Sequence, residues 1–501
     1  MKNYKYIILL ALAGFTSCQD AIDIEQVGRL TPEVAFETVE DLEDGLFAVY
    51  DNYDLTPEIA FNAEYTDEVA RGFAGGGQGQ NTGLAYILNS GSAASTTFWI
   101  NGYAELNAVN RLISASEVIE KAEDGSEDAL FNDILGQAYA LRAFSHFQLL
   151  SYYSTDYADD NALGVILVDF VPTVDQQLLR STNGEIYAAI NEDLNIAETL
   201  IASQSNPTFV SKDFIRALRT RMAAYRQDYT LAEQLALDLV EDYPLADRAA
   251  YKALFLDEDN TEVIFKLERI DNDSYDGQGA TGSVVASGWA GARFAFTNGT
   301  INGGVYYEFD RSLFNLFDLS DIRYDTFLTD DSVVSSDYQN TANYVQDDIL
   351  VVGKYPGSEG VPLMNDLKVF RSSEMQLIVA ESRAATGRLN GATNSAAAAI
   401  KELRDIRFGS DTDLPIYANE TEAFAAILNE RRIEFAFEGH RWKDIKRMGV
   451  RASQGAQRDP LDCVFNGQCG LLPTDYRFTL PIPQVEFNGN PGLREQQNPG
   501  Y

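Results

Sequence analysis

The strongest constraint on the fold is a set of amphipathic segments whose apolar faces are rich in small residues. The clearest is 132–153, where one face repeats at the i, i+4, i+7, i+11 and i+14 positions of an α-helix. On that face lie Gly136, Ala140, Ala143, Phe147 and Leu150. Small side chains let a second helix approach closely, so this segment predicts a helix packed tightly against a neighbour.

Two adjacent segments, 211–226 and 229–242, have the form of a helix-turn-helix pair. Residues 186–200 and 374–388 look like further members of the same set. The residues placed as in a tetratricopeptide unit are Ala217, Ala224, Tyr225, Tyr229, Ala232 and Ala236. Because such pairs cannot bury their faces alone, we predict that they stack into a right-handed helical solenoid.

Changes in composition divide the chain into parts. We expect an N-terminal helical part at 32–257, a loop-rich insertion at 258–370, and a C-terminal helical part with an extended tail at 371–501. The insertion is rich in Gly, Asn, Asp and Ser and holds short β-like runs such as Val263–Leu267. We expect the insertion to form a loop-rich, irregular ligand-binding region packed on the helices.

Further helices are predicted outside the insertion. Thr31 and Pro32 are typical of the N-cap and first position of a helix, and apolar residues follow them at near-helical spacing. Helical spacing also appears at 97–121, 372–388, 393–407 and 420–449. Residues 71–83 break every pattern, and a Gly-rich loop of this length inside a domain is often functional.

Residues 1–17 have the layout of a signal peptide. A basic start precedes the apolar run Ile7–Phe15, which is too short for a membrane span of about 20 residues. Small residues precede Cys18 as in a bacterial lipobox, so we expect acylation at Cys18, with 18–31 as lipid anchor and tether. Several acyl chains would hold the protein at a membrane, whereas one chain binds only marginally. An ordinary secretory signal with an incidental cysteine is the alternative.

The two remaining cysteines, Cys463 and Cys469, lie close together in a loop-like stretch. In an exported protein, a local disulfide is the natural expectation for an even pair. Two free thiols are the alternative, and two sulfurs with no nearby histidine do not predict a metal site.

The charge of the chain limits its partners. It has 76 acidic and 38 basic residues, which gives a formal charge of −38 and argues against nucleic-acid binding. His146 and His440 are the only histidines, so a His-based catalytic or metal site is not expected, and we interpret both as structural. We predict no cofactor, although structural Ca²⁺ bound by carboxylates stays open.

Three stretches near the C-terminus are distinctive. Residues 428–447 read LNERRIEFAFEGHRWKDIKR, and residues 369–381 read VFRSSEMQLIVAE. Residues 480–486 read LPIPQVE and precede a terminal QNPGY at 497–501. Together with Leu141–Phe144 and the lipobox, these stretches resemble the SusD/RagB family of Bacteroidetes outer-membrane lipoproteins, and the resemblance covers nearly the whole mature chain.

The resemblance implies a specific role. Family members have a mainly helical fold with four tetratricopeptide-like units and pair with a SusC-like TonB-dependent outer-membrane transporter. They capture oligosaccharides, or peptides in the RagB-like branch, and act as a lid over the transporter barrel. The expected location is therefore the outer membrane, with a lipid anchor and the body facing the cell exterior.

The charged motif at 428–447 has a structural interpretation that we prefer. Glu430, Glu434 and Glu438 lie four residues apart and have basic residues nearby, which predicts a structural ion-pair network rather than ligand contact. Trp442 in this motif and Trp99 at a helix start are interpreted as packing residues. Trp289 is left as the one tryptophan on a loop, where small neighbours would leave a ring face open.

Two stretches combine aromatic rings with polar side chains. A ring can cover the apolar C–H face of a sugar while polar groups pair with its hydroxyl rim. We expect the two stretches to converge on one ligand-binding surface above the helices. The candidates in the first are Tyr65, Asp67, Arg71, Phe73, Asn81 and Tyr86, and those in the second are Tyr275, Trp289, Arg293, Phe296 and Tyr306.

Three other functions stay open at this stage. A glycoside hydrolase needs two carboxylates at defined separations, one with a raised pKa, and no motif indicates such a pair; we therefore do not expect an enzyme. A peptide-binding protein would have a long groove with backbone-pairing groups. A purely structural lid would make no ligand contact of its own.

Overall fold

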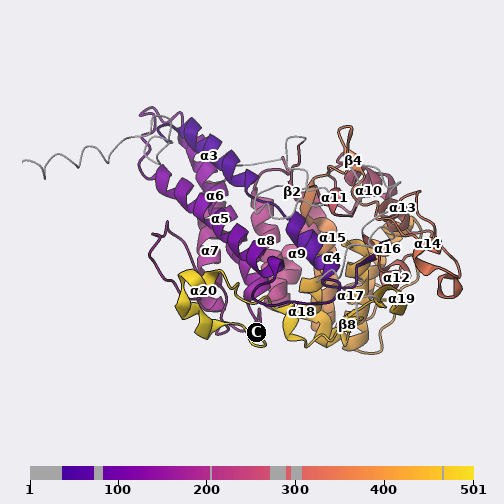
Figure 1. Ribbon diagram of the computed structural model, residues 1–501. Helices are drawn as coiled ribbons and strands as arrows, with labels where there is room; N and C mark the ends of the chain where they lie inside the picture. Colours follow the sequence, from indigo (N-terminus) through magenta and orange to yellow (C-terminus); the bar gives the residue numbers. More distant parts are fainter. Residues whose placement is uncertain (1–35, 73–82, 203–205, 271–288, 295–306, 465–467) are drawn as a thin grey trace, which may run out of the picture.

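α-Helices are the main secondary structure of the chain that the computed structural model describes, which is residues 36–72, 83–202, 206–270, 289–294, 307–464 and 468–501 (Figure 1). This confirms the prediction of a mainly α-helical protein. The main helices are α3 (Val39–Asp51), α5 (Ala93–Ser116), α6 (Asp128–Tyr153), α7 (Asn183–Leu200), α8 (Lys212–Tyr225), α9 (Tyr229–Asp242), α15 (Ser372–Ala385), α16 (Ala396–Phe408), α17 (Glu420–Glu434) and α18 (Arg441–Ala452).

Consecutive helices pack as pairs. The pairs are α6 with α7, α8 with α9, α15 with α16, and α17 with α18, and α9 also packs on α15. Figure 1 shows α8, α9 and α15 in the middle, with α3, α5, α6 and α7 on one side and α16 and α17 on the other. The α9–α15 contact therefore joins the two helical parts of the chain. Their stacking as a tetratricopeptide-like solenoid, and the boundaries drawn around the insertion, stay predictions.

Small residues do allow close helix packing, as the pattern at 132–153 predicted. A Cβ atom placed on Gly136 of α6 would lie 2.8 Å from the backbone nitrogen of Ile201, just after α7. A Cβ atom on Gly102 of α5 would lie 2.6 Å from a methyl carbon of Leu149 on α6. Both distances are too short for any side chain larger than hydrogen.

Side-chain caps fix where several helices begin. Asp228 caps α9 by accepting from the backbone of Leu231, so α9 begins at Tyr229 as predicted. Thr38 forms a capping box with Asp41 and starts α3 at Val39. The predicted start at Thr31 lies outside the described residues, and within them this helix begins only at α3.

The prediction of one helix over 420–449 is wrong. The chain forms α17 and α18, separated by a turn in which Phe437 has φ 62° and Gly439 has φ 80°. These left-handed conformations end the helical path. The turn places Phe435 and Phe437 in the core, where both are at most 2% exposed.

Short strands tie distant segments together. The predicted run Val263–Leu267 is β2, a fully buried strand that pairs antiparallel with β6 (Leu367–Arg371). The loop-rich region therefore begins and ends on one strand pair.

The remaining α-helices and strands are short. They are α4 (Thr56–Glu64), β1 (Val69–Arg71), α10 (Arg248–Leu254), α11 (Ala290–Phe294), β3 (Tyr307–Phe309), α12 (Arg311–Phe314), α13 (Ile322–Phe327), α14 (Tyr344–Asp347), β4 (Gly357–Ser358), β5 (Val361–Pro362), β7 (Ala456–Gln457), α19 (Pro460–Cys463), β8 (Gly470–Leu471) and α20 (Glu486–Gly489).

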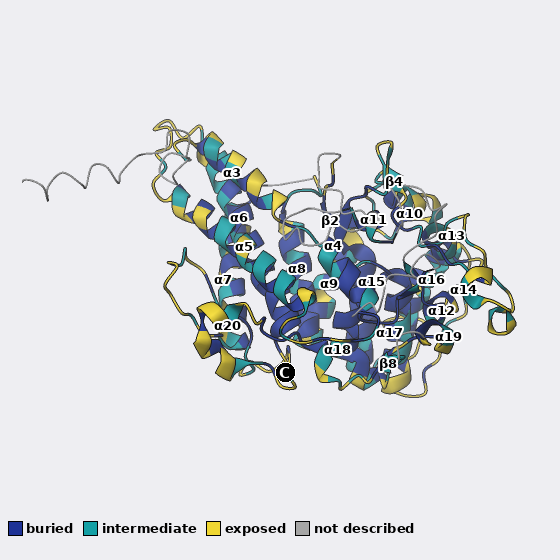
Figure 2. Ribbon diagram, viewed as in Figure 1, coloured by how far each residue is buried: buried dark blue, intermediate teal, exposed yellow. Residues whose placement is uncertain are grey.

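A buried ion-pair network occupies the core near α17, as predicted for the charged motif. One carboxylate oxygen of Glu434 lies 3.0 Å from Arg371 Nη1 and 2.9 Å from Arg407 Nη2. Its other oxygen lies 3.2 Å from Arg323 Nη1. All four side chains are at most 2% exposed, and Figure 2 shows the surrounding helices as mainly buried. These residues therefore bind one another rather than a ligand.

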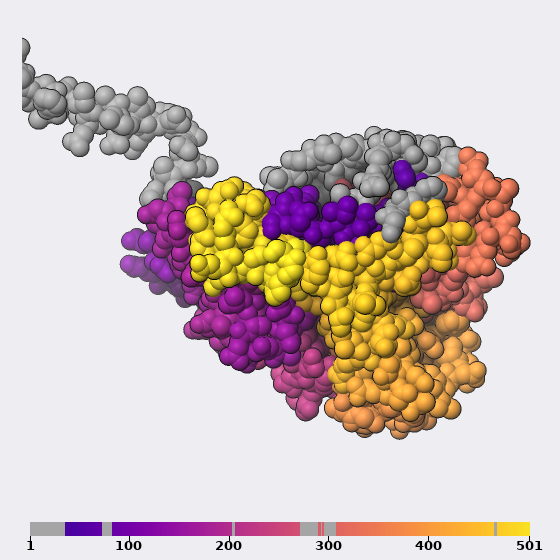
Figure 3. All heavy atoms as spheres, turned by 60° about the horizontal axis from the view of Figure 1, so that its bottom comes forward, coloured from indigo at the N-terminus to yellow at the C-terminus, as the bar shows by residue number. Residues whose placement is uncertain are grey.

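The C-terminal segment lies across the helical body. In Figure 3 it forms one face together with residues from the N-terminal third of the chain. Asn498 donates to the backbone oxygens of Tyr153 and Leu480 at 2.8 and 2.6 Å. Trp99 Nε1 donates to Glu486 at 2.9 Å. Within the described ranges, no helix is both long and apolar enough to cross a membrane.

The other packing predictions are also confirmed. Trp99 and Trp442 are 2% and 1% exposed, His146 is fully buried, and His440 stacks on Phe435 with ring centroids 4.6 Å apart.

The predicted disulfide is present. Cys463 and Cys469 are bonded, with their Cα atoms 5.1 Å apart.

Candidate functional site

The two stretches predicted to form the ligand site meet in the structure. Strand β1 pairs antiparallel with β3, which places Arg71 opposite Tyr307. Helix α11 packs on both α4 and β3. The described parts of the two stretches therefore lie next to each other, and we call the surface formed by α4, β1, α11 and β3 the strand-edge surface. That this surface binds a ligand stays a prediction.

Trp289 lies at the start of α11 on this surface. Its side chain is half-buried, and Arg293 one turn later lies 3.8 Å from Glu64 at the end of α4. One of its small neighbours, Gly291, has a packing role. A Cβ atom on Gly291 would lie 2.7 Å from the carbonyl oxygens of Tyr355 and Leu363, so this glycine lets α11 pack closely on the chain beneath it.

Two of the predicted ligand residues, both tyrosines, are buried in the body instead. Tyr65 is 8% exposed and donates to the backbone oxygen of Ile87 at 3.0 Å. Tyr86 is 1% exposed, donates to the backbone oxygen of Thr66 at 3.1 Å, and has the Arg458 guanidinium 4.3 Å from its ring centre. Their faces are used for packing, which corrects the prediction that they line a sugar site.

Asp67 is also a structural residue. It is 1% exposed, and Arg441 binds both of its carboxylate oxygens at 2.8 and 2.9 Å. Burial by itself would raise the pKa of Asp67, but Arg432, Arg441 and the backbone N–H of Gln457 outweigh it and hold that pKa well below the usual value. Asp67 therefore ties β1 to α17 and α18 and has no oxygen left for a ligand.

The next residue, Glu68, has the opposite electrostatics. It is fully buried, and the backbone N–H of Phe437 donates to one of its carboxyl oxygens at 3.3 Å. Burial raises the pKa of Glu68 to about 8, so the side chain is mainly neutral at pH 7. The strand-edge surface thus rests on one ionised and one neutral carboxyl group, side by side in sequence.

Several predicted site residues cannot be placed. Phe73, Asn81, Tyr275, Phe296 and Tyr306 lie outside the described residues. Arg71 is half-buried on β1. The described candidates that keep exposed area at the strand-edge surface are therefore Arg71, Trp289 and Arg293.

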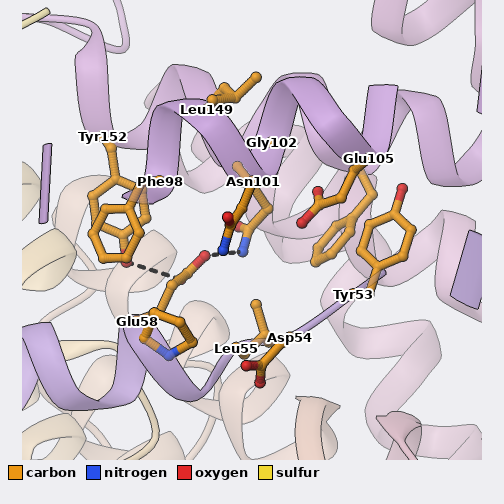
Figure 4. Close-up of a pocket in the computed structure, with 13 residues that line it drawn as sticks. Tyr53, Asp54, Leu55, Glu58, Phe98, Asn101, Gly102, Glu105, Leu149 and Tyr152 are labelled. Carbon is orange, nitrogen blue, oxygen red and sulfur yellow. Dashed lines mark hydrogen bonds between the residues drawn. The ribbon is translucent and has the colours of Figure 1, made fainter. Parts of the chain in front are cut away.

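A separate small cavity lies between α4, α5 and α6 and was not predicted. Figure 4 shows the carboxyl groups of Asp54, Glu58 and Glu105 around it. Its volume of about 30 Å³ is enough for a water molecule but not for a sugar. Desolvation there, opposed by a Ser145 hydrogen bond and reinforced by the other two carboxyl groups, raises the pKa of Glu105 to about 8.

The described residues include no group of three or more His, Cys, Asp or Glu side chains arranged to hold a metal ion. Structural Ca²⁺ stays a prediction for the chain as a whole. Asp67 and Glu68 at the strand-edge surface are not candidates for a catalytic carboxylate pair. Asp67 is fully paired with arginine, and Glu68 is inaccessible to solvent.

Comparisons with known proteins agree with the architecture. Residues 363–501 match the model of the SusD family, and residues 31–227 match a model described as "Starch-binding associating with outer membrane". SusD-like protein P2 of Formosa agariphila is 25% identical, with both chains covered in full.

Solved structures show the same fold. A SusD superfamily protein from Bacteroides vulgatus has a TM-score of 0.71 at 21% identity, covering 93% of this chain and all of the other. Surface glycan-binding protein A from Bacteroides fluxus has a TM-score of 0.68 at 20% identity, again covering 93% of this chain and all of the other. Two family models of the SusD type, each matching part of the chain, and a SusD-like relative along its full length together support the SusD family for this chain.

Proposed function

We propose that this protein binds a glycan at the outer membrane without cleaving it. The observation that carries the proposal is the match of residues 31–227 to a family described as starch-binding and associated with the outer membrane. The similar protein from Bacteroides fluxus is itself named a glycan-binding protein, which supports the same class of ligand.

The strand-edge surface is the proposed place of binding. Trp289 offers a half-buried indole that can cover the apolar face of a sugar ring, and Arg293 and Arg71 offer donors to hydroxyl oxygens. The side chains beneath are held rigidly, because Asp67 fixes β1 to α17 and α18. A fixed platform loses less conformational entropy when it binds a ligand.

Membrane attachment and transport complete the proposal. Acylated Cys18 would anchor the chain, and the tether at 18–31 would hold the body outside the cell. A SusC-like TonB-dependent transporter would then receive the captured oligosaccharide. These parts rest on the sequence of the N-terminal segment and on the family.

The test begins with the soluble chain from residue 19. We would measure its retardation in native gels containing starch, laminarin, xylan or mannan, and then titrate matching oligosaccharides by calorimetry. We expect binding to at least one neutral glycan, about tenfold weaker binding in Trp289→Ala, and no release of reducing ends.

Phe170→Ala is the matched control, because Phe170 is 40% exposed and lies in the connection between α6 and α7. It should bind as the wild type does. Absence of binding to every glycan tested would refute the proposed function. Unchanged binding in Trp289→Ala would instead remove the strand-edge surface and leave the ligand class intact.

A further inference from the structure

A cleft of about 300 Å³ opens between the C-terminal end of α3, the turn at 206–209 and the residues that follow β2. None of its lining residues was predicted from the sequence to bind a ligand, and none belongs to the strand-edge surface. Its volume is at the lower end of the range for small-molecule sites. The cleft is therefore large enough for a ligand, unlike the small cavity beside α4.

Aromatic rings form one wall of this cleft. Phe47 is 45% exposed, whereas Leu46 and Val49 on the same helix are at most 3% exposed. The Phe47 and Phe209 ring centroids are 6.1 Å apart, and Tyr50 meets Phe209 edge-to-face at 5.6 Å. The apolar wall is thus a cluster of rings rather than one isolated exposed side chain.

The aromatic wall is held in place by hydrogen bonds. The Tyr50 hydroxyl donates to Gln137 at 2.5 Å and accepts from the backbone N–H of Val210 at 2.8 Å. The first bond fixes the ring to α6, and the second fixes the turn that carries Phe209. The cleft is therefore pre-organised, which favours binding of a rigid ring-shaped ligand.

The charges around the cleft select against anions. Arg269 is the only basic residue among the described lining residues, and its Nη2 already binds Asp54 at 2.9 Å. Arg269 is 5% exposed, so its charge is neutralised inside the protein. Asp51 and Glu268 are exposed, and both carboxylates repel sulfate or uronate groups, while Asp51 can also accept a hydrogen bond from a hydroxyl group.

We propose that the Phe47–Phe209 cleft is a second saccharide-binding subsite, which takes a neutral sugar ring from the same glycan. This inference rests on the proposed function. The ring wall supplies the apolar platform, and the exposed Asp51 carboxylate supplies a polar group.

The test compares variants of the soluble chain on the neutral glycan that retards the wild type most. We expect at least threefold weaker binding in Phe47→Ala and a near-normal affinity in Phe47→Tyr, which keeps the ring. Phe47→Leu should bind like Phe47→Ala, because it keeps an apolar side chain without a ring face. Phe170→Ala should bind normally, and circular dichroism would establish that each variant is folded.

The outcomes separate the two proposals. If Phe47→Ala and Phe47→Leu both bind the glycan as tightly as the wild type does, the subsite is overturned and the proposed function stands. If the wild type binds none of the neutral glycans, both fail. Stronger binding of alginate or carrageenan, with loss of that binding in Phe47→Ala, would overturn the assignment of a neutral sugar.

Discussion

Replacement of Glu434 by glutamine tests the buried network on which the C-terminal part of the fold depends. The carboxylate has three guanidinium partners within 3.2 Å, all nearly inaccessible to solvent. The amide of the Glu434→Gln variant would keep the shape of the side chain but lose its charge, leaving Arg323, Arg371 and Arg407 with less compensation. Removing one partner of a buried ion pair costs about 3–5 kcal/mol, so we expect a loss of that size.

Urea unfolding followed by circular dichroism measures this loss. The unfolding entropy of a body of about 470 residues is about 1 kcal/mol per kelvin, so the melting temperature should also fall by about 3–5 °C. Glu420→Gln is the matched control, because Glu420 pairs with Arg451 at 2.7 Å but is 49% exposed. An exposed pair contributes at most about 1 kcal/mol.

One result would contradict the predicted role of Glu434. If Glu434→Gln lowers the free energy of unfolding no more than Glu420→Gln does, the motif at 428–447 does not stabilise the fold through its buried charges.

The pH dependence of stability is a second check. Arg407, Arg371 and Arg323 overcome burial and hold the pKa of Glu434 well below its usual value, so its contribution is present at neutral pH and is lost as the pH falls below about 4.

Two further predictions concern the body. Burial raises the pKa of Glu68 from 4.5 to about 8, so its folded carboxyl stabilises the protein at low pH and loses that contribution as the pH rises through 8. Glu68→Gln should therefore gain up to a few kcal/mol over the wild type between pH 6 and pH 9, measured by urea midpoints, and parallel pH profiles would contradict this. Gly136→Ala should destabilise the protein by about 1–3 kcal/mol, because the new Cβ atom would press on Ile201. Gly489→Ala is the control and should have little effect, because a Cβ atom there meets nothing within 4 Å. Equal melting temperatures for the two variants would argue against tight α6–α7 packing.

Local patterns were sufficient to predict several of the long helices. Residues 229–242 form α9 with the predicted bounds, because the capping Asp228 and the apolar spacing act within a few residues. The break after Glu434 could not be predicted in the same way. It depends on Phe437 adopting a left-handed conformation, which is unfavourable locally and is compensated by burial of its ring.

The site was harder to predict than the fold. The structure places β1 beside β3, so described parts of the two predicted stretches are neighbours, but their role as one ligand-binding surface stays a prediction. The pairing of Asp67 with Arg441, far away in the chain, and the packing of Tyr86 on Arg458 could not be predicted. A ring or carboxylate looks the same in sequence whether its partner is a ligand or a distant arginine.

Phe47 is the reverse case, a residue whose spacing suggests the core but whose side chain is exposed. It lies eleven residues after Phe36 and three before Tyr50, spacings that place all three on one helix face, and yet its side chain is 45% exposed. A residue next to a buried stripe can face either inward or outward, and only the neighbouring turn at 206–209 decides which. Sequence spacing alone could not identify the cleft.

The most direct test of the proposed glycan site uses the three tryptophans. In a chain labelled with ¹⁵N-tryptophan, each indole Nε1–H gives one NMR signal, and Trp99 and Trp442 are buried controls, the first of them hydrogen-bonded to Glu486. Addition of a bound oligosaccharide should shift the Trp289 signal, assigned with Trp289→Phe, and leave the other two in place. Saturating binding with no change at Trp289 would contradict the assignment of the strand-edge surface.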